Sequence, residues 1–237
     1  FWTPELPNLY RLRAEIRTGD AVVGAIAGRI GLRRLGVRGR SFRLDGRRWV
    51  PRGVRTVTEF DADSFRARAT AAVMSNPDDA ACGRADAAGV AVVALPEGEG
   101  GGLPEAASAA ARILAWAVHP AVCLVLLPPG TGPAAAREVA AAVRSFKGTL
   151  LLGWWVDGAE PPPAQVPQGI DWLAVAVGPA GRAHDAWRDA APTLPLVACG
   201  GAGGREGCDT LQAALAAWGL ADGRERVPWD WAGYLVW

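Results

Sequence analysis

The stretch HPAVCLVLLPPG, residues 119–130, contains an apolar run of strand length that ends in two prolines and a glycine. An Ala-rich stretch of helical character precedes it at 104–118, and another follows it at 133–146. A short β-rich run between two helical stretches is typical of a parallel strand in an α/β protein. The stretch therefore predicts one strand–helix unit, and the fold depends on how often this unit repeats along the chain.

The unit repeats over most of the sequence. Eight strand candidates lie near 49–54, 70–74, 90–95, 121–127, 149–155, 171–177, 194–199 and 232–237. The helical candidates between them are 63–69, 78–88, 104–118, 133–146, 181–190 and 209–219. Eight strands that alternate with helices predict an α/β fold, a compact (β/α)8 TIM-type barrel.

Two features make this predicted barrel smaller than is usual for the fold, because each removes a helix. The segment 156–170 is too rich in proline for a regular helix, and the eighth strand ends the chain, so the last helix is lacking. An open doubly wound sheet is the alternative. The stretch GEGGGLP at 98–104 does not support it, because it lacks the GxGxxG spacing of a dinucleotide-binding loop.

A few antiparallel strands precede the predicted barrel. The runs LYRLRAEIRT and AVVGAIAGRIGLRRL lie within 8–35 and are separated by a Gly-Asp turn. Apolar and polar residues alternate in the first run, which predicts a half-buried strand. The stretch FRLDGRRWVPRGV at 42–54 predicts a hairpin with Asp45 and Gly46 at its turn. So few strands do not form a sandwich by themselves. They either pack on the barrel or end a domain that begins upstream.

Composition excludes several classes of function. The chain has 237 residues, 50% of them hydrophobic, and a net charge of +1, which gives no electrostatic case for nucleic acid or a membrane surface. Neither a cofactor nor a metal site is expected, since the four cysteines form no CxxC and only two histidines are present. Buried free thiols are expected, with a Cys199–Cys208 disulfide as the alternative. The cellular compartment is left undetermined.

Several stretches resemble glycoside hydrolase family 2, the family of β-galactosidases and β-glucuronidases. FWTPELPNLYRLRAEI resembles the last strand of its immunoglobulin-like domain. RIGLRRLGVRGRSFRLDGRRWVPRGV is similar to the passage into its catalytic barrel, with the "F-x-L-[ND]-G" hairpin and "RGV". ILAWAVHPAVCLVLLPPGTG is similar to "R-x-x-N-H-P-S-[IV]-x-x-W-S-x-G-N-E-x-G", and AGYLVW to the eighth strand.

This resemblance implies two regions and a class of ligand. Residues 1–36 would be the C-terminal strands of an immunoglobulin-like β-sandwich, and residues 37–237 the glycoside-hydrolase-like barrel. Further domains of the same polypeptide would complete the sandwich. The implied ligand is a β-linked glycan.

The resemblance also locates the two catalytic glutamates of the family. When the family motif is aligned with this sequence at His119 and Pro120, the acid/base glutamate that follows the fourth strand falls on Gly130. The nucleophile after the seventh strand falls on Gly200, or on Cys199 if the register slips by one. None of these residues carries a carboxylate, and a retaining glycosidase needs two. We therefore expect a catalytically inactive pseudoglycosidase, or a scaffold region of a larger protein.

Two alternatives rest on other residues at the predicted strand ends. Glu97 and Asp157 follow the third and fifth strands, and as displaced carboxylates they would make an active β-glycoside hydrolase. Trp154, Trp155, Trp237 and Arg55 would instead line the mouth of a carbohydrate-binding module. Neighbouring residues of a strand face opposite ways, so only one of Trp154 and Trp155 points inward.

Two further residues are given structural roles. The resemblance places His119 at the entry of the fourth strand, on the face of the barrel that contributes to stability, and so implies a structural role. Arg52 is predicted to be a charge inside the barrel that requires a buried partner.

Overall fold

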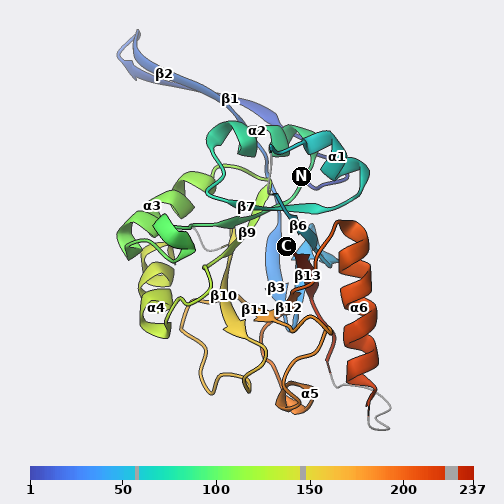
Figure 1. The fold of residues 1–237 in the computed structure, drawn as a ribbon. Helices are drawn as coiled ribbons and strands as arrows, with labels where there is room; N and C mark the ends of the chain where they lie inside the picture. Colours follow the sequence, from blue (N-terminus) through green and yellow to red (C-terminus); the bar gives the residue numbers. More distant parts are fainter. Residues whose placement is uncertain (57–58, 145–147, 222–228) are drawn as a thin grey trace.

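The computed structural model describes residues 1–56, 59–144, 148–221 and 229–237. Its centre is a closed barrel of eight strands in sequence order, and each neighbouring pair is parallel (Figure 1). The strands are β6 (Arg52–Arg55), β7 (Ala71–Ser75), β8 (Val92–Leu95), β9 (Val122–Leu126), β10 (Leu151–Asp157), β11 (Trp172–Ala176), β12 (Leu196–Cys199) and β13 (Gly233–Val236). Pairing of β13 with β6 closes the barrel. The TIM-type prediction is thus confirmed, and the open-sheet alternative is wrong.

The helices surround these strands (Figure 1). They are α1 (Ala62–Ala67), α2 (Asp79–Ala88), α3 (Ala106–Trp116), α4 (Pro133–Ala142), α5 (Ala186–Asp189) and α6 (Arg205–Gly219), with a short 3-10 turn η1 (Glu99–Gly101). The predicted helix at 133–146 is shorter in the structure, and its last two positions lie outside the described residues. No helix connects β10 to β11, as the prolines predicted. None of the described helices has the length and apolarity required to cross a membrane.

Strand β9 is buried along its whole length, as expected of a parallel strand that has the barrel interior on one face and helices on the other. Small residues inside the barrel make room for large ones. A Cβ at Gly153 would overlap the indole ring of Trp172, which is fully buried. Glycine on β10 therefore allows a tryptophan from β11 to fill the interior.

A three-stranded antiparallel sheet leads into the barrel. It consists of β3 (Leu35–Arg38), β4 (Ser41–Leu44) and β5 (Arg47–Trp49). Asp45 and Gly46 form the β4–β5 turn with φ of 49° and 78°, the left-handed conformation that a two-residue hairpin turn requires. Phe42 is fully buried, and its ring meets the ring of Trp172 edge-on at 6.0 Å. The sheet thus packs against the start of β11.

The strands β1 (Tyr10–Thr18) and β2 (Ala21–Ile30) form a hairpin that projects away from the barrel (Figure 1). Apart from Gly24, every residue of both strands is exposed. The prediction of a half-buried strand is therefore wrong for β1, because no second layer among the described residues covers its apolar face. On that face Ile16 and Ile26 are 69% and 70% exposed.

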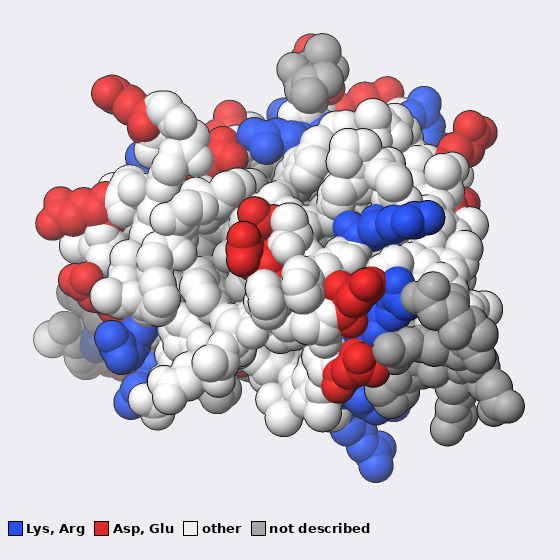
Figure 2. Space-filling model, turned by 60° about the horizontal axis from the view of Figure 1, so that its bottom comes forward, with Lys and Arg blue, Asp and Glu red and all other residues white. Residues whose placement is uncertain are grey.

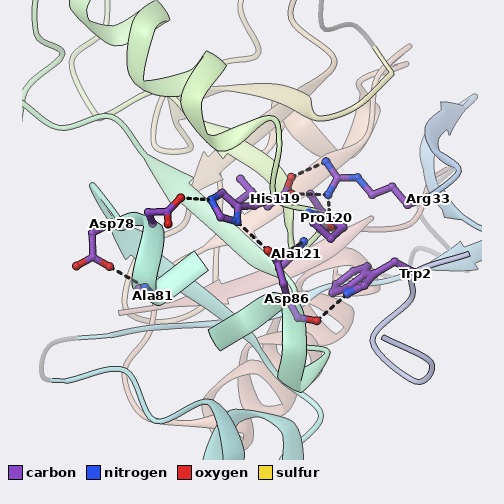
Figure 3. A network of polar contacts seen from close by, with 11 residues as sticks. Trp2, Arg33, Asp78, Ala81, Asp86, His119, Pro120 and Ala121 are labelled. Atoms are coloured by element: carbon purple, nitrogen blue, oxygen red, sulfur yellow. Dashed lines mark hydrogen bonds and ion pairs between the residues drawn. The ribbon is translucent and has the colours of Figure 1, made fainter. Parts of the chain in front are cut away.

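Two side chains attach the N-terminal segment to the barrel (Figure 3). Trp2 is fully buried, and its indole Nε1 donates to the carbonyl oxygen of Asp86 at 2.9 Å. Arg33 donates to the carbonyl oxygens of His119 (2.9 Å), Pro120, Val122 (2.8 Å) and Thr149. These carbonyls lie at the starts of β9 and β10, so Arg33 holds the N-terminal segment at the end of the barrel where the strands begin.

His119 has the structural role that its position predicted. Its Nδ1 lies 2.7 Å from Asp86 Oδ2 and its Nε2 lies 3.1 Å from Asp79 Oδ1. The second oxygen of Asp86 accepts the backbone N–H of Ala121 at 2.8 Å (Figure 3). The hydrogen bond with Asp86 raises the pKa of His119. The three side chains thus connect α2 to the entry of β9.

The four cysteines are free and buried, so the Cys199–Cys208 disulfide does not form. Burial raises the pKa of Cys82 to about 12 and that of Cys208 to about 11. Burial also raises the pKa of Cys123 and of Cys199. These thiols are therefore packing groups. Among the described residues, no group of three or more His, Cys, Asp and Glu could hold a metal ion.

Candidate functional site

The ends of the barrel strands define where chemistry could occur, since TIM-type enzymes carry their sites at the C-terminal ends of the strands. The parallel register pairs Arg55 with Val73 and Ser75 with Leu95, and it pairs Trp155 with Ala174. Alternation along each strand then directs Arg55, Ser75 and Trp155 to the interior side. Glu97 and Trp237 follow β8 and β13 at the same end.

These residues form one cluster, which we call the mouth cluster: Arg55, Ser75, Glu97, Trp155 and Trp237. Arg55 Nη2 donates to Ser75 Oγ at 3.0 Å and to both carboxylate oxygens of Glu97, at 3.3 and 3.4 Å. The Arg55 guanidinium lies over the Trp237 ring, 5.2 Å from its centroid. The rings of Trp237 and Trp155 are 5.4 Å apart at 34°. The structure thus brings together four of the residues that the sequence singled out.

A second set of contacts fixes the loop that carries Glu97. Asn76 donates from Nδ2 to the Glu97 carbonyl oxygen at 2.7 Å and accepts the Glu97 N–H at 3.1 Å. Arg112 from α3 donates to the same carbonyl at 2.8 Å and to Asn76 Oδ1 at 2.6 Å. Sequence reasoning missed Ser75, Asn76 and Arg112. Ser75 and Asn76 lie directly after the predicted strand at 70–74, and this position could have marked them as candidate site residues.

Two of the predicted site residues lie apart from the mouth cluster. Trp154 is buried on the outer side of β10, where its Nε1 donates to the Thr131 carbonyl at 2.8 Å. Trp155 is therefore the inward-facing member of the pair. Asp157 is exposed at the end of β10, and its Oδ1 accepts the N–H of Ala159 at 2.9 Å. This contact stabilises the turn that follows the strand.

Gly130 and Gly200, on which the resemblance would place the two catalytic glutamates, have backbones that disfavour a side chain. Gly130 is exposed with φ of +79°, a left-handed conformation that a residue with a Cβ adopts only with strain. At Gly200 a Cβ would lie 2.7 Å from the carbonyl oxygen of Val177. A side chain at either position would therefore require the loop to change.

Arg52 does not lie inside the barrel. Its Nε donates to Asp209 Oδ1 at 2.9 Å, and its Nη2 donates to Gln212 Oε1 at 2.6 Å. Both partners belong to α6, so Arg52 points outward. The prediction of an interior charge is wrong because β6 directs Arg55, and not Arg52, to the interior side.

The molecular surface shows no large patch of one charge on the face in Figure 2. Single Arg, Asp and Glu side chains are scattered there among uncharged residues. This agrees with the near-neutral net charge of +1.

No protein-family model matches the chain, and no curated protein matches it. Solved structures do. A GH2 β-galacturonidase from Eisenbergiella tayi bound to galacturonate has a TM-score of 0.69 at 16% identity and matches all of this chain and 52% of its own. A β-glucuronidase from Ruminococcus gnavus in complex with C6-substituted uronic isofagomine has a TM-score of 0.72 at 15% identity, with coverage of 100% and 51%.

A glycosyl hydrolase family 2 member from Bacteroides cellulosilyticus DSM 14838 matches all of this chain and 35% of its own, with a TM-score of 0.69 and 15% identity. The chain thus spans about half the length of the first two proteins. At such low identity the likeness establishes the fold. This chain has the fold of a glycoside hydrolase family 2-like barrel together with the strands that precede it.

Proposed function

We propose that this chain is the barrel region of a pseudoglycosidase, a family 2-like protein that does not hydrolyse glycosides by the retaining mechanism. The observation that carries the proposal is the pair Gly130 and Gly200. Both occupy the catalytic positions implied by the resemblance, and their backbones disfavour a side chain. Glycine can neither transfer a proton nor form a glycosyl ester.

The environment of Glu97 supports the same proposal. A retaining glycosidase uses two carboxyl groups about 5–5.5 Å apart, one as acid/base and one as nucleophile. Both oxygens of Glu97 face the Arg55 guanidinium. Glu97 therefore serves as the counter-ion of Arg55. The alternative of an active hydrolase requires Glu97 and Asp157 to act as displaced carboxylates.

A second candidate function is carbohydrate binding at the mouth cluster. The rings of Trp155 and Trp237 are partly exposed, and they lie beside the hydrogen-bonding groups of Arg55, Ser75 and Glu97. Aromatic faces next to polar groups suit a sugar ring, which has apolar faces and hydroxyl edges. The related structures from Eisenbergiella tayi and Ruminococcus gnavus were solved with galacturonate and uronic isofagomine. A β-linked glycan is the proposed ligand here.

We also propose that residues 1–36 include the C-terminal strands of an immunoglobulin-like sandwich. The β1–β2 hairpin supports this, because it has one apolar face that is exposed in this chain. A two-stranded hairpin is at best marginally stable by itself. Further domains of the same polypeptide would supply the covering sheet.

The test is hydrolysis of a panel of aryl β-glycosides by the purified chain and by the variants Glu97→Ala and Asp157→Ala. Glu138→Ala, on α4, is the matched control. We expect no variant to differ from the parent and no turnover above the buffer blank. Turnover that Glu97→Ala or Asp157→Ala abolishes, and that Glu138→Ala retains, would replace this proposal with the displaced-carboxylate mechanism.

Binding is tested separately, by titrating the same glycans against the parent chain and Trp237→Ala. Binding that this substitution weakens would support the carbohydrate-binding function. If no glycan bound to either protein, the scaffold role would remain as the proposed function.

A further inference from the structure

Of the five residues of the mouth cluster, only Arg55 is a cation and only Glu97 is an anion. The Arg55 side chain is 34% exposed, so a ligand at the mouth can reach its guanidinium, whereas the Glu97 side chain is 13% exposed. The two carboxylate oxygens of Glu97 lie 3.3 and 3.4 Å from Arg55 Nη2. Guanidinium groups bind carboxylates in this way, so Glu97 takes the position that the carboxylate of an acidic ligand would take.

The contacts that hold the two partners do not depend on the Glu97 carboxylate. Asn76 and Arg112 fix the loop through the main-chain N–H and carbonyl oxygen of Glu97, and neither contacts its side chain. Ser75 Oγ accepts a hydrogen bond from Arg55 at 3.0 Å. Removal of the Glu97 side chain would therefore leave both the loop and the guanidinium in place.

The remaining donors of Arg55 suit uncharged groups. Its Nε and Nη1 have no hydrogen-bond partner among the residues that the structure describes, since Nη2 makes the contacts with Ser75 and Glu97. Because Glu97 balances the positive charge, the pair has no net charge with which to attract an anion. Val57 and Thr58, outside the described residues, carry no charge that could change this balance. The free N–H groups can still donate to the hydroxyl oxygens of a neutral sugar.

We propose that Glu97 makes the mouth cluster selective for neutral glycans, because it occupies the carboxylate position on Arg55. This inference rests on the carbohydrate-binding function proposed above. An acidic sugar would have to displace a carboxylate that the chain itself tethers beside Arg55 at high effective concentration. The two carboxylates would also repel each other. A neutral sugar meets neither obstacle, so the selectivity comes from rejection of the acidic ligand.

The test compares methyl β-galactoside with methyl β-galacturonide, which differ only in carrying a hydroxymethyl group or a carboxylate. Ligand-observed NMR titrations give both dissociation constants for the parent chain and for Glu97→Ala. The parent should bind the neutral glycoside at least about tenfold more tightly than the acidic one, because like charges that meet in a site are costly. Glu97→Ala should bind the acidic glycoside at least about tenfold more tightly than the parent does, since the vacated guanidinium then forms charge-assisted hydrogen bonds. This gain should weaken as salt is added.

Two further variants show whether the effect belongs to this ion pair. Glu99→Ala is the matched control, because Glu99 is an exposed carboxylate in the same loop, and this variant should keep the preference of the parent. Arg55→Ala added to Glu97→Ala should abolish the gain in acid binding. Thermal melts check that every variant is folded.

The outcomes separate this inference from the function on which it rests. If the neutral glycoside binds and Glu97→Ala leaves the preference unchanged, the inference is overturned and the carbohydrate-binding function stands. An equal gain in Glu99→Ala, or a gain that survives the loss of Arg55, would also overturn the inference alone. If neither glycoside binds the parent or any variant, both are overturned.

Discussion

Glycine at position 153 decides how the barrel interior is filled. Its missing side chain leaves the space that the Trp172 ring occupies, so Gly153→Ala forces a buried ring to move. Such overpacking costs about 1–3 kcal/mol. We expect a lower midpoint in urea unfolding. Gly83→Ala is the control, because a Cβ there meets nothing within 4 Å and alanine favours the helix α2. Equal midpoints for the two variants would contradict this account of the interior.

His119 makes stability depend on pH. Carboxylates only accept hydrogen bonds, so both ring nitrogens donate to Asp86 and Asp79 when His119 is protonated. The hydrogen bond with Asp86 raises the pKa of His119 above its ordinary value of 6.5. The resulting stabilisation is complete below pH 6.5, and it is lost as the pH rises through the raised pKa.

The pH dependence is measured by urea unfolding from slightly acidic to alkaline pH. The parent chain should lose stability over this range, and His119→Asn should lose less. Asp86→Asn should flatten the profile more than Asp79→Asn, because the Asp86 side chain is 10% exposed and that of Asp79 is 96% exposed. Parallel profiles for the parent and His119→Asn would show that the imidazole does not carry the effect.

The sequence predicted four residues of the mouth cluster, but it did not predict Arg112, which holds the loop of Glu97, and the reason is physical. Arg55, Glu97, Trp155 and Trp237 lie at or just after the ends of predicted strands, and this position alone indicates the mouth of a barrel. Arg112 lies in the middle of α3 and reaches Glu97 only through its long side chain. No pattern in the sequence marks that contact.

At the scale of elements, the β1–β2 hairpin is the part of the fold that depends on its surroundings. One face carries apolar residues and the other carries arginines, and both are exposed. Exposed apolar faces with free strand edges promote self-association. We expect the chain to form concentration-dependent oligomers, and we expect Ile16→Lys with Ile26→Lys to reduce them.

Light scattering over a range of protein concentrations measures this. Ala25→Lys with Ala27→Lys, on the opposite face, adds the same charge and is the control. The control should associate more than the Ile16 and Ile26 variant. Oligomers of equal size in both variants would mean that charge, and not the apolar face, governs association.

The helices and strands also show which features of the fold a sequence pattern can predict. All eight barrel strands were predicted, because burial on both faces produces continuous apolar runs that few other elements have. The start of α6 was predicted four residues late, since its N-cap is Gly204 and no capping side chain marks the boundary. The alternation in β1 indicates a face suited to being covered. This alternation does not indicate whether the covering sheet is present.

At the scale of the whole molecule, the N-terminal segment and the barrel form one packed unit. Trp2 is fully buried, and it bonds to Asp86, which also contacts His119 and Ala121. Truncating a buried tryptophan costs about 3–5 kcal/mol. Because Trp2 packs against α2, which flanks the barrel, its loss should lower the stability of the entire chain. It should not release the N-terminal segment alone.

We therefore expect Trp2→Ala to shift a single unfolding transition to lower urea concentration, with far-ultraviolet circular dichroism and tryptophan fluorescence changing together. Phe1→Ala is the control, since Phe1 is 44% exposed and should cost far less. If Trp2→Ala instead produced two transitions, or left the circular dichroism midpoint unchanged, the segment would be an independent appendage. A coincident shift would mean that residues far apart in the sequence share one core, because burial of Trp2 depends on contacts 84 residues away.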